Sequence, residues 1–294
     1  MDWKPPATPG GTIAPKYEHD SAHHRIQVTD NAAWRTLIFE HNQQSSMALD
    51  DPFETDIEYF GYFHIAMALK PDAARTLVIG LGGGTVVKRM WRDYPAMHLD
   101  AVEIDPEVAE IAREMFALPV DDRICVTVGD GREFVKVTSN TYDIVIVDAF
   151  DDDRIPRHLT TEEFMREIRD VLAPDGVVAF NFIGSLHGSR SKPFRSLYRT
   201  ASNVWRRVWV FGVGYADNPS HPGHNIILLA TDNDLTAAEL LERIASRVGG
   251  LVTVRAFHLF GEDLYQGAIR RNDVPLILDE PGAKRGPREK KRRG

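Results

Sequence analysis

Glycines and acidic side chains with the spacing of a nucleoside-binding site occur between residues 76 and 150. A glycine-rich loop follows an apolar run at residues 76–79, and an acid ends or follows each of the next three apolar runs. The residues concerned are Gly80, Gly82, Gly84, Glu103, Asp130, Gly131 and Asp148. Glycines let a ligand approach the main chain, and an acid about 20 residues beyond such a loop can accept hydrogen bonds from both ribose hydroxyls. We therefore expect Glu103 to bind ribose and Asp130, which lies between two glycines, to accept from an adenine amino group.

Each of these signals has a simpler explanation when it is taken alone. The loop has Thr85 where the dinucleotide-binding pattern has its last glycine, so by itself it could be a structural turn. Any one acid could be a helix cap or a solvated loop end. The four features coincide at the ends of successive predicted strands, and this coincidence favours a nucleoside site.

A second acidic cluster follows directly after the fourth apolar run. Asp151, Asp152 and Asp153 come just after Asp148 and form an anionic rim that would repel a phosphate group and suit a cationic ligand. A sulfonium donor and an amine acceptor are both cationic, and an amine must lose a proton before it becomes a nucleophile. Asp148 is the carboxylate that we expect to accept this proton. The alternative for residues 151–153 is a solvated turn that precedes the next helix.

Alternating strands and helices must position these side chains. Strands are predicted at residues 76–79, 99–104, 124–128, 144–147 and 177–182, with helices that begin at Asp105 and at Thr160, the latter as a capping box with Glu163. This alternation predicts an α/β fold with a mostly parallel sheet, whose carboxyl-terminal edge carries the site. Further strands are expected at residues 204–213 and 225–231, and a helix at 236–248. Before them, short apolar runs near residues 26–28 and 36–39 predict a hairpin or small sheet, and residues 59–69 a helix.

The chain divides into four predicted regions. Residues 1–20 are expected to be a flexible leader, 21–70 a small β-rich domain with a connecting helix, 71–280 the catalytic domain and 281–294 a disordered basic tail. No apolar run approaches the roughly 20 residues of a membrane span, and the first residues lack the pattern of a signal peptide. We therefore expect a cytoplasmic protein with no membrane partner.

Charge separates the tail from the rest of the chain. The net charge of the 294 residues is −8, although the last eleven carry seven Lys or Arg against one Glu. The remaining body is strongly acidic, which disfavours nucleic acid as a partner except through the tail and is compatible with a cationic substrate. Runs of like charge beside Gly and Pro are more often solvated than bound.

The chain resembles the spermidine synthases, a family of polyamine aminopropyltransferases with a methyltransferase-like Rossmann fold, from about residue 21 to residue 231. The resemblance is carried by residues 25–28, 44–47, 79–84, 102–105, 129–131, 148–151 and 159–164. It implies a small N-terminal β-strand domain, a seven-stranded catalytic domain and a homodimer or homotetramer. It also implies transfer of an aminopropyl group from decarboxylated S-adenosylmethionine to a polyamine such as putrescine.

The resemblance also implies roles for individual residues. Glu103 would hold ribose, Asp130 adenine, and Asp148 would act on the attacking amine. Gln44 would belong to the donor site, whereas Asp151, Tyr62 and His221 would belong to the acceptor site.

Three departures from the family pattern affect the alkyl group and its acceptor. Gly83 replaces an Asp that grips the aminopropyl ammonium, Phe63 replaces a Gln or His, and His221 replaces an amine-contacting Tyr. Each missing charge-assisted hydrogen bond could cost about 1.5–3 kcal/mol.

Three functions therefore stay open on sequence grounds. The first is aminopropyl transfer, which retention of Asp148 and Asp151 favours. The second is methyl transfer from S-adenosylmethionine to a small molecule, and the third is nucleoside binding without catalysis. The absence of the family's Asp at Gly83 favours the second and third functions. No metal is expected, because His221 and His224 have no third ligand near them in the sequence.

Overall fold

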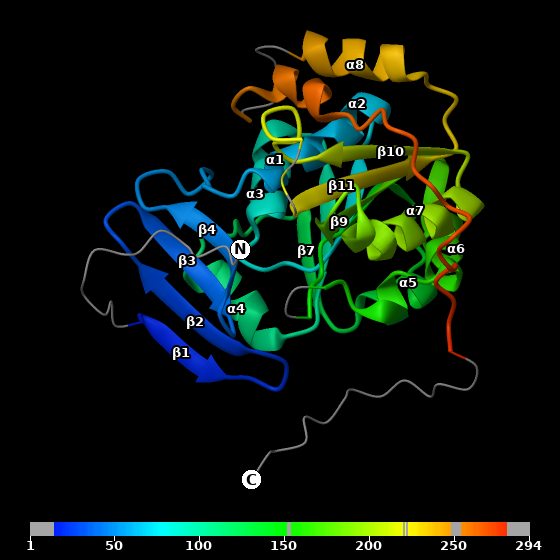
Figure 1. The fold of residues 1–294 in the computed structure, drawn as a ribbon. Helices are drawn as coiled ribbons and strands as arrows, with labels where there is room; N and C mark the ends of the chain where they lie inside the picture. The colour runs from blue at the N-terminus through cyan, green and yellow to red at the C-terminus, as the bar shows by residue number, and fades with distance from the viewer. Residues whose placement is uncertain (1–14, 152–153, 220, 222, 248–253, 281–294) are drawn as a thin grey trace.

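Two β-sheets organise the computed structural model, which describes residues 15–151, 154–219, 221, 223–247 and 254–280 (Figure 1). The smaller sheet is built from the N-terminal part of the chain and the larger one from residues 75–231. The expected basic tail lies outside the described residues, as do Asp152 and Asp153.

The larger sheet has seven strands and is mostly parallel, as the sequence predicted. Its strands are β5 (Arg75–Ile79), β6 (His98–Glu103), β7 (Ile124–Val128), β8 (Tyr142–Val147), β9 (Leu172–Gly184), β10 (Arg207–Gly212) and β11 (His224–Thr231). They lie in the order β10-β11-β9-β8-β5-β6-β7, and only β11 runs antiparallel to its two neighbours. The order along the chain reverses between β5 and β8, so the connections that leave these two strands diverge and open a crevice at their carboxyl ends.

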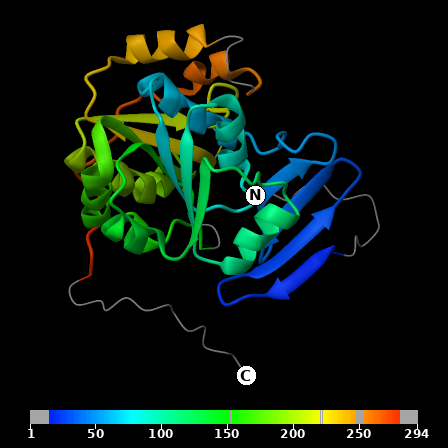
Figure 2. The same ribbon diagram turned by 180° about the vertical axis from the view of Figure 1, so that it is seen from behind.

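Helices cover both faces of this sheet (Figures 1 and 2). One face packs against α1 (Tyr59–Tyr62), α2 (Ala66–Leu69), α3 (Thr85–Asp93) and α8 (Ala237–Ser246), and the other against α5 (Gly131–Val137), α6 (Glu162–Val171) and α7 (Lys192–Val204). Alternate residues of one strand enter opposite cores, so that Val78 packs on the first face and Leu77 and Ile79 on the second. The parallel strands are apolar along both faces for this reason.

The predicted helix starts are right in one case and wrong by one residue in the other. Asp105 caps α4 (Pro106–Glu114), because its side chain accepts from the Glu107 amide. The cap of α6 is Thr161, whose side chain accepts from the Phe164 amide. The Thr160 hydroxyl instead donates to the Arg157 carbonyl at 2.8 Å, which ends the short 3-10 helix η2 (Arg157–Leu159).

The smaller sheet is an antiparallel meander, and it shortens the expected leader. Its strands are β1 (Tyr17–Asp20), β2 (Arg25–Asp30), β3 (Trp34–Phe39) and β4 (Asn42–Ala48), in that order. Residues 17–20 were expected to be flexible, but β1 pairs with β2 in a regular register. The apolar face of the sheet packs on α4 through Ile26, Val28 and Leu37, and this contact holds β4 beside the larger sheet.

The remaining segments connect these layers. The helix expected over residues 59–69 consists of α1, the 3-10 turn η1 (Phe63–Ile65) and α2 in direct succession. The last element after α8 is the 3-10 helix η4 (Phe257–Asp263). Residues 265–280 then run without helix or strand along α7 and α6 (Figure 1). The other 3-10 helix, η3 (Ser189–Ser191), leads into α7. Among the described residues, no helix has both the length and the apolar character that a bilayer span requires.

Candidate active site

A cleft of about 740 Å³, its mouth to solvent included, lies at the carboxyl ends of β5, β6 and β8. Of the residues predicted to form the site, those that line it are Gly80, Gly82, Gln44, Glu103, Asp130, Gly131 and Asp148. Gly84, Tyr62, Asp151 and His221 do not line it. The other lining residues include His24, Ser45, Tyr59, Phe60, Phe150 and His158.

The glycine loop fixes the floor of the cleft. Gly80 directly follows β5 with φ +93°, and a Cβ atom at this position would lie 2.3 Å from the Asp148 carbonyl oxygen. Only glycine therefore lets the chain leave β5 so close to the end of β8. Gly84, which was predicted to bind the cofactor, instead occupies the N-cap of α3 in a left-handed conformation, where it starts the helix.

Glu103 lies beneath the loop and binds its backbone. One carboxylate oxygen accepts from the Leu81 amide at 2.9 Å and, more weakly, from the Gly82 amide at 3.4 Å, while the other accepts from the Asp105 amide at 3.0 Å. Burial raises the pKa of Glu103, and these amide hydrogen bonds limit the rise. Because a carboxylate has about four acceptor positions and three of those of Glu103 are used by these amides, about one remains for a hydroxyl group of a sugar.

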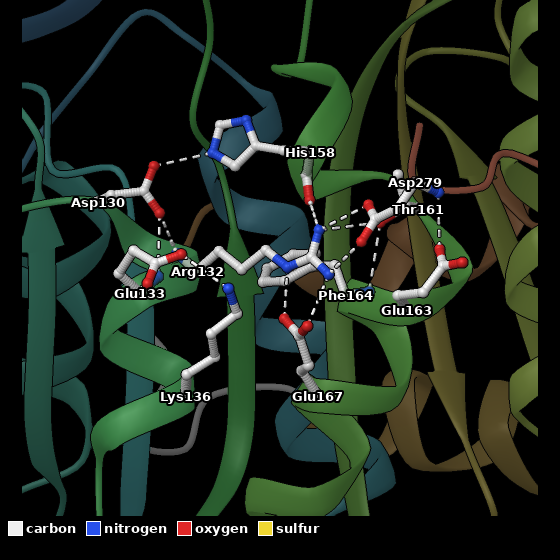
Figure 3. Close-up of polar contacts among 10 residues, drawn as sticks. All are labelled: Asp130, Arg132, Glu133, Lys136, His158, Thr161, Glu163, Phe164, Glu167 and Asp279. Atoms are coloured by element: carbon white, nitrogen blue, oxygen red, sulfur yellow. Dashed lines mark hydrogen bonds and ion pairs between the residues drawn. The ribbon is translucent and has the colours of Figure 1, made fainter. Parts of the chain in front are cut away.

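Asp130 caps α5 and also faces the cleft. Its Oδ1 accepts from the Arg132 and Glu133 amides at 2.9 and 3.0 Å, and its Oδ2 lies 2.9 Å from Nε2 of His158 (Figure 3). Burial opposes ionisation, but the hydrogen bonds from His158 and the two amides lower the pKa of Asp130 to about 2. The helix-cap alternative and the site prediction are therefore both compatible with its position.

Asp148 has two side-chain donors of its own. Asn181 Nδ2 donates to Oδ1 at 2.9 Å, and the Tyr59 hydroxyl donates to Oδ2 at 3.3 Å. Burial raises the pKa of Asp148 to about 6, against the lowering effect of these two hydrogen bonds. Asn181 is itself fixed, since its Oδ1 accepts from Asn225 Nδ2 at 3.0 Å. The arrangement gives a half-buried carboxylate that can accept a proton near neutral pH.

The tyrosine that lines the cleft is Tyr59, whereas Tyr62, which was predicted for the acceptor site, does not line it. Tyr62 is 1% exposed, stacks on Phe260 at 4.0 Å between ring centroids, and donates its hydroxyl to Asp263. Its side chain therefore packs under η4, away from the cleft. Desolvation and the charge of Asp148 raise the pKa of Tyr59 well above its usual value, so that its hydroxyl stays a donor.

Two other predicted acceptor residues are exposed outside the cleft. Asp151 follows Phe150, which lines the cleft, and its amide donates to the Arg154 carbonyl at 2.8 Å. The His221 ring contacts the Gly223 carbonyl through Nδ1 and lies 5.2 Å from the His224 ring. Within the described ranges, no group of three or more His, Cys, Asp or Glu is placed to hold a metal ion.

The position of Gly83 is packed rather than open. A Cβ atom there would lie 2.9 Å from Cδ1 of Phe116 and 2.9 Å from Cβ of Ser45. Phe116 is fully buried, and the Ser45 hydroxyl accepts from the Gly83 amide at 2.9 Å. The space that a side chain at this position would enter is therefore occupied by Ser45 of β4 and by Phe116, the second residue after α4.

The charged groups of the cleft are mostly acidic. Glu103, Asp130 and Asp148 line it, and among the lining residues that the structure describes there is no Lys or Arg. Such a cleft favours a ligand that is neutral or cationic where it meets these acids.

Sequence reasoning missed three residues of this site. Tyr59 was overlooked in favour of Tyr62, one helical turn later. Asn181 interrupts the apolar run of β9, and a polar residue in a buried strand is a signal that could have been used. His158 carries no local signal, because its partner Asp130 lies 28 residues earlier.

The seven-stranded sheet, the glycine loop at its crevice and the acids at the ends of β6, β7 and β8 define a Rossmann-like α/β protein of the nucleoside-binding class. The model of the spermine/spermidine synthase domain matches residues 62–182. The chain is 33% identical over 193 residues to a polyamine aminopropyltransferase of Vibrio vulnificus, which covers 62% of this chain and 64% of that protein. It is also 33% identical over 182 residues to a polyamine aminopropyltransferase of Chromobacterium violaceum, with 61% and 68% covered.

The chain thus belongs to the spermine/spermidine synthase family. The alignment leaves about a third of the Vibrio vulnificus relative unmatched. The crystal structure of a probable spermidine synthase from Corynebacterium glutamicum has the same fold, with a TM-score of 0.71 at 20% identity over 92% of this chain and 99% of that one.

Proposed function

We propose that the protein transfers an aminopropyl group from decarboxylated S-adenosylmethionine to an amine of the polyamine type. The observation that carries the proposal is Asp148, a carboxylate at the cleft with a pKa of about 6 and two fixed donors. Attack by an amine requires removal of a proton, and a base with this pKa is ionised at neutral pH while still able to accept one. Membership of a family whose relatives are named polyamine aminopropyltransferases supports the same reaction.

In the proposed reaction the amine nitrogen attacks the methylene carbon next to the sulfonium. The new C–N bond forms as the C–S bond breaks, its electron pair stays on sulfur, and methylthioadenosine leaves. The ammonium proton passes to Oδ2 of Asp148, while Asn181 holds Oδ1 and prevents rotation of the carboxylate. Glu103 and Asp130 bind the ribose and the adenine in this proposal, and Gln44 contacts the donor from β4.

The charge of the cleft supports the decarboxylated donor over S-adenosylmethionine. Intact S-adenosylmethionine carries a carboxylate that would have to enter a cleft with three acids and no lining Lys or Arg. The decarboxylated donor ends in an ammonium instead. The packed position of Gly83 nevertheless removes the ammonium partner that the family pattern provides, and this keeps methyl transfer as the second candidate.

Offering the purified protein each donor with a panel of amines, and following products by mass spectrometry, separates the candidates. Methylthioadenosine with an aminopropylated amine would support the proposal. S-adenosylhomocysteine as the product would replace it with methyl transfer. Binding of a donor without turnover would instead indicate a nucleoside-binding protein that does not catalyse.

Asp148→Asn tests the proton acceptor directly. The variant keeps the size of the side chain and removes its charge, so turnover should fall at least about 100-fold while donor affinity changes little. Calorimetric titration with methylthioadenosine measures the affinity. Turnover within a few-fold of the wild type would exclude Asp148 as the base.

The family resemblance also supports a cytoplasmic homodimer or homotetramer, which we propose on that basis alone. Light scattering of the full chain measures the oligomer directly. A monomer at micromolar concentration would contradict this part of the proposal.

A further inference from the structure

The last described residues of the chain bind the elements that form one wall of the cleft. Residues 277–280, which we call the C-terminal strap, contact both α6 and η2. The Ile277 carbonyl accepts from the Glu162 amide at 2.8 Å, and the Asp279 amide donates to Glu163 at 2.9 Å. Arg157 donates to the Leu278 carbonyl at 2.9 Å, which ties η2 to the same segment. Pro156, His158 and Leu159, within and beside η2, line the cleft.

Arg132 connects this strap to the interior. Its side chain is 1% exposed, and its guanidinium makes bidentate contacts with Asp279, at 2.9 and 2.9 Å, and with Glu167 (Figure 3). It also lies 5.7 Å from the centre of the Phe164 ring. Burial opposes the charge, but the two carboxylates raise the pKa of Arg132 above its ordinary value. A guanidinium so placed is held in one orientation by its two planar partners.

The same guanidinium reaches the pair that faces the nucleoside site. Nη1 of Arg132 donates to the His158 carbonyl at 3.0 Å, and the Arg132 amide donates to Oδ1 of Asp130 at 2.9 Å. His158 and Asp130 are in turn 2.9 Å apart through Nε2 and Oδ2. Arg132 therefore holds both members of the pair, one through its side chain and one through its backbone (Figure 3).

We propose that Arg132 and Asp279 are positioning residues for the adenine end of the donor. Asp279 orients the guanidinium, the guanidinium fixes the backbone of η2 at His158, and His158 fixes Oδ2 of Asp130, the oxygen that does not cap α5. The strap thus sets the direction of a hydrogen-bond acceptor about half the chain away from it in sequence. This inference rests on the proposed role of Asp130 in nucleoside binding.

The ion pair could also serve stability alone, and the two roles differ in what they change. A purely structural pair would alter the melting temperature and leave the affinity of the folded protein for nucleosides unchanged. A positioning pair alters the donor KM and leaves kcat at saturating donor unchanged, because Asp148 and Tyr59 share no hydrogen bond with Arg132 in the described structure.

Asp279→Asn is the informative variant, because it keeps the side-chain volume and leaves Arg132 paired with Glu167. Asp273→Asn is the matched control: Asp273 pairs with Arg195 on α7, in the same C-terminal segment but away from the cleft residues. Calorimetric titration with methylthioadenosine measures binding, and steady-state assays give KM for donor and amine separately. Melting temperatures show that both variants are folded.

We expect Asp279→Asn to weaken methylthioadenosine binding about tenfold, the effect of one misplaced charge-assisted hydrogen bond, with a matching rise in donor KM. The kcat and the amine KM should not change, and Asp273→Asn should bind as the wild type does. Asp279→Glu, which restores the charge, should recover part of the affinity. Equal binding by the wild type and Asp279→Asn would overturn the positioning role alone. A wild type that binds no nucleoside would overturn the proposed function and this role together.

Discussion

Replacing Tyr59 by Phe should shift the pH dependence of turnover without moving any backbone. The Tyr59 hydroxyl donates to Oδ2 of Asp148 at 3.3 Å, near the long end of the hydrogen-bond range. A hydrogen bond to the ionised form lowers a pKa, so its loss raises the pKa of Asp148 above its present value of about 6. A contribution of about 1 kcal/mol corresponds to a rise of about 0.7 pKa unit.

The direction in which kcat/KM changes with pH follows from the ionisation of Asp148, because only the ionised carboxylate can accept the proton. At pH 5.5 the ionised fraction of Asp148 should fall about fourfold in the variant, whereas at pH 8.5 it should hardly change. The ratio of kcat/KM for the amine, variant over wild type, should therefore drop as the pH is lowered from 8.5 to 5.5. The amine's own ionisation cancels in this ratio, since both proteins meet the same acceptor.

Tyr62→Phe provides the control, because Tyr62 donates to Asp263 and does not line the cleft. Its ratio should be independent of pH, even if the variant is less stable. A flat ratio for Tyr59→Phe would refute the coupling between Tyr59 and Asp148. A sloping ratio for Tyr62→Phe would refute the assignment of the two tyrosines.

Three further substitutions test how the loop and its partners are packed. Gly83→Asp should lower stability by about 1–3 kcal/mol and bring no gain in donor affinity, because its Cβ would meet Phe116 at 2.9 Å; tighter donor binding in this variant would show that the space is open. Gly80→Ala should cost about 3 kcal/mol or more in urea unfolding, since its Cβ would lie 2.3 Å from the Asp148 carbonyl, and a wild-type midpoint would contradict the close approach of the two strands. Glu103→Gln should weaken methylthioadenosine binding at least about tenfold and destabilise the loop. Both carboxylate oxygens of Glu103 accept from backbone N–H groups, and the side-chain NH2 of Gln would place a donor against one of these donors. Unchanged calorimetric binding would remove Glu103 from the site.

The acids of the site could be located from the sequence because one rule of topology brings them together. Glu103, Asp130 and Asp148 each follow an apolar run, and parallel strands present their carboxyl ends at one edge. Neither the hydrogen-bond partners of these acids nor their ionisation could be predicted. Asn181 reaches Asp148 only because β8 and β9 are neighbours in the sheet, and this pairing spans 33 residues of sequence.

The choice between Tyr59 and Tyr62 shows a different limit. Residues three apart on a helix differ by about 60° in direction, so both can lie on the same broad face. The direction of each ring is set by η4, which packs on Tyr62 through Phe260 and Asp263 about 200 residues later. Local periodicity contains no information on that contact. The one-residue error at Thr160 has a local origin instead, because the carbonyl of Arg157, three residues earlier, accepts from its hydroxyl.

The contact between the smaller sheet and α4 has a consequence for how the protein unfolds. Ile26, Val28 and Leu37 share one apolar cluster with Val108 and Ile111 of α4. Separating the two parts would expose apolar surface on both, so a chain cut near residue 50 should give fragments that aggregate rather than two soluble domains. The described chain should therefore melt in one cooperative transition, and the boundary seen between the two sheets divides the architecture without dividing the folding unit.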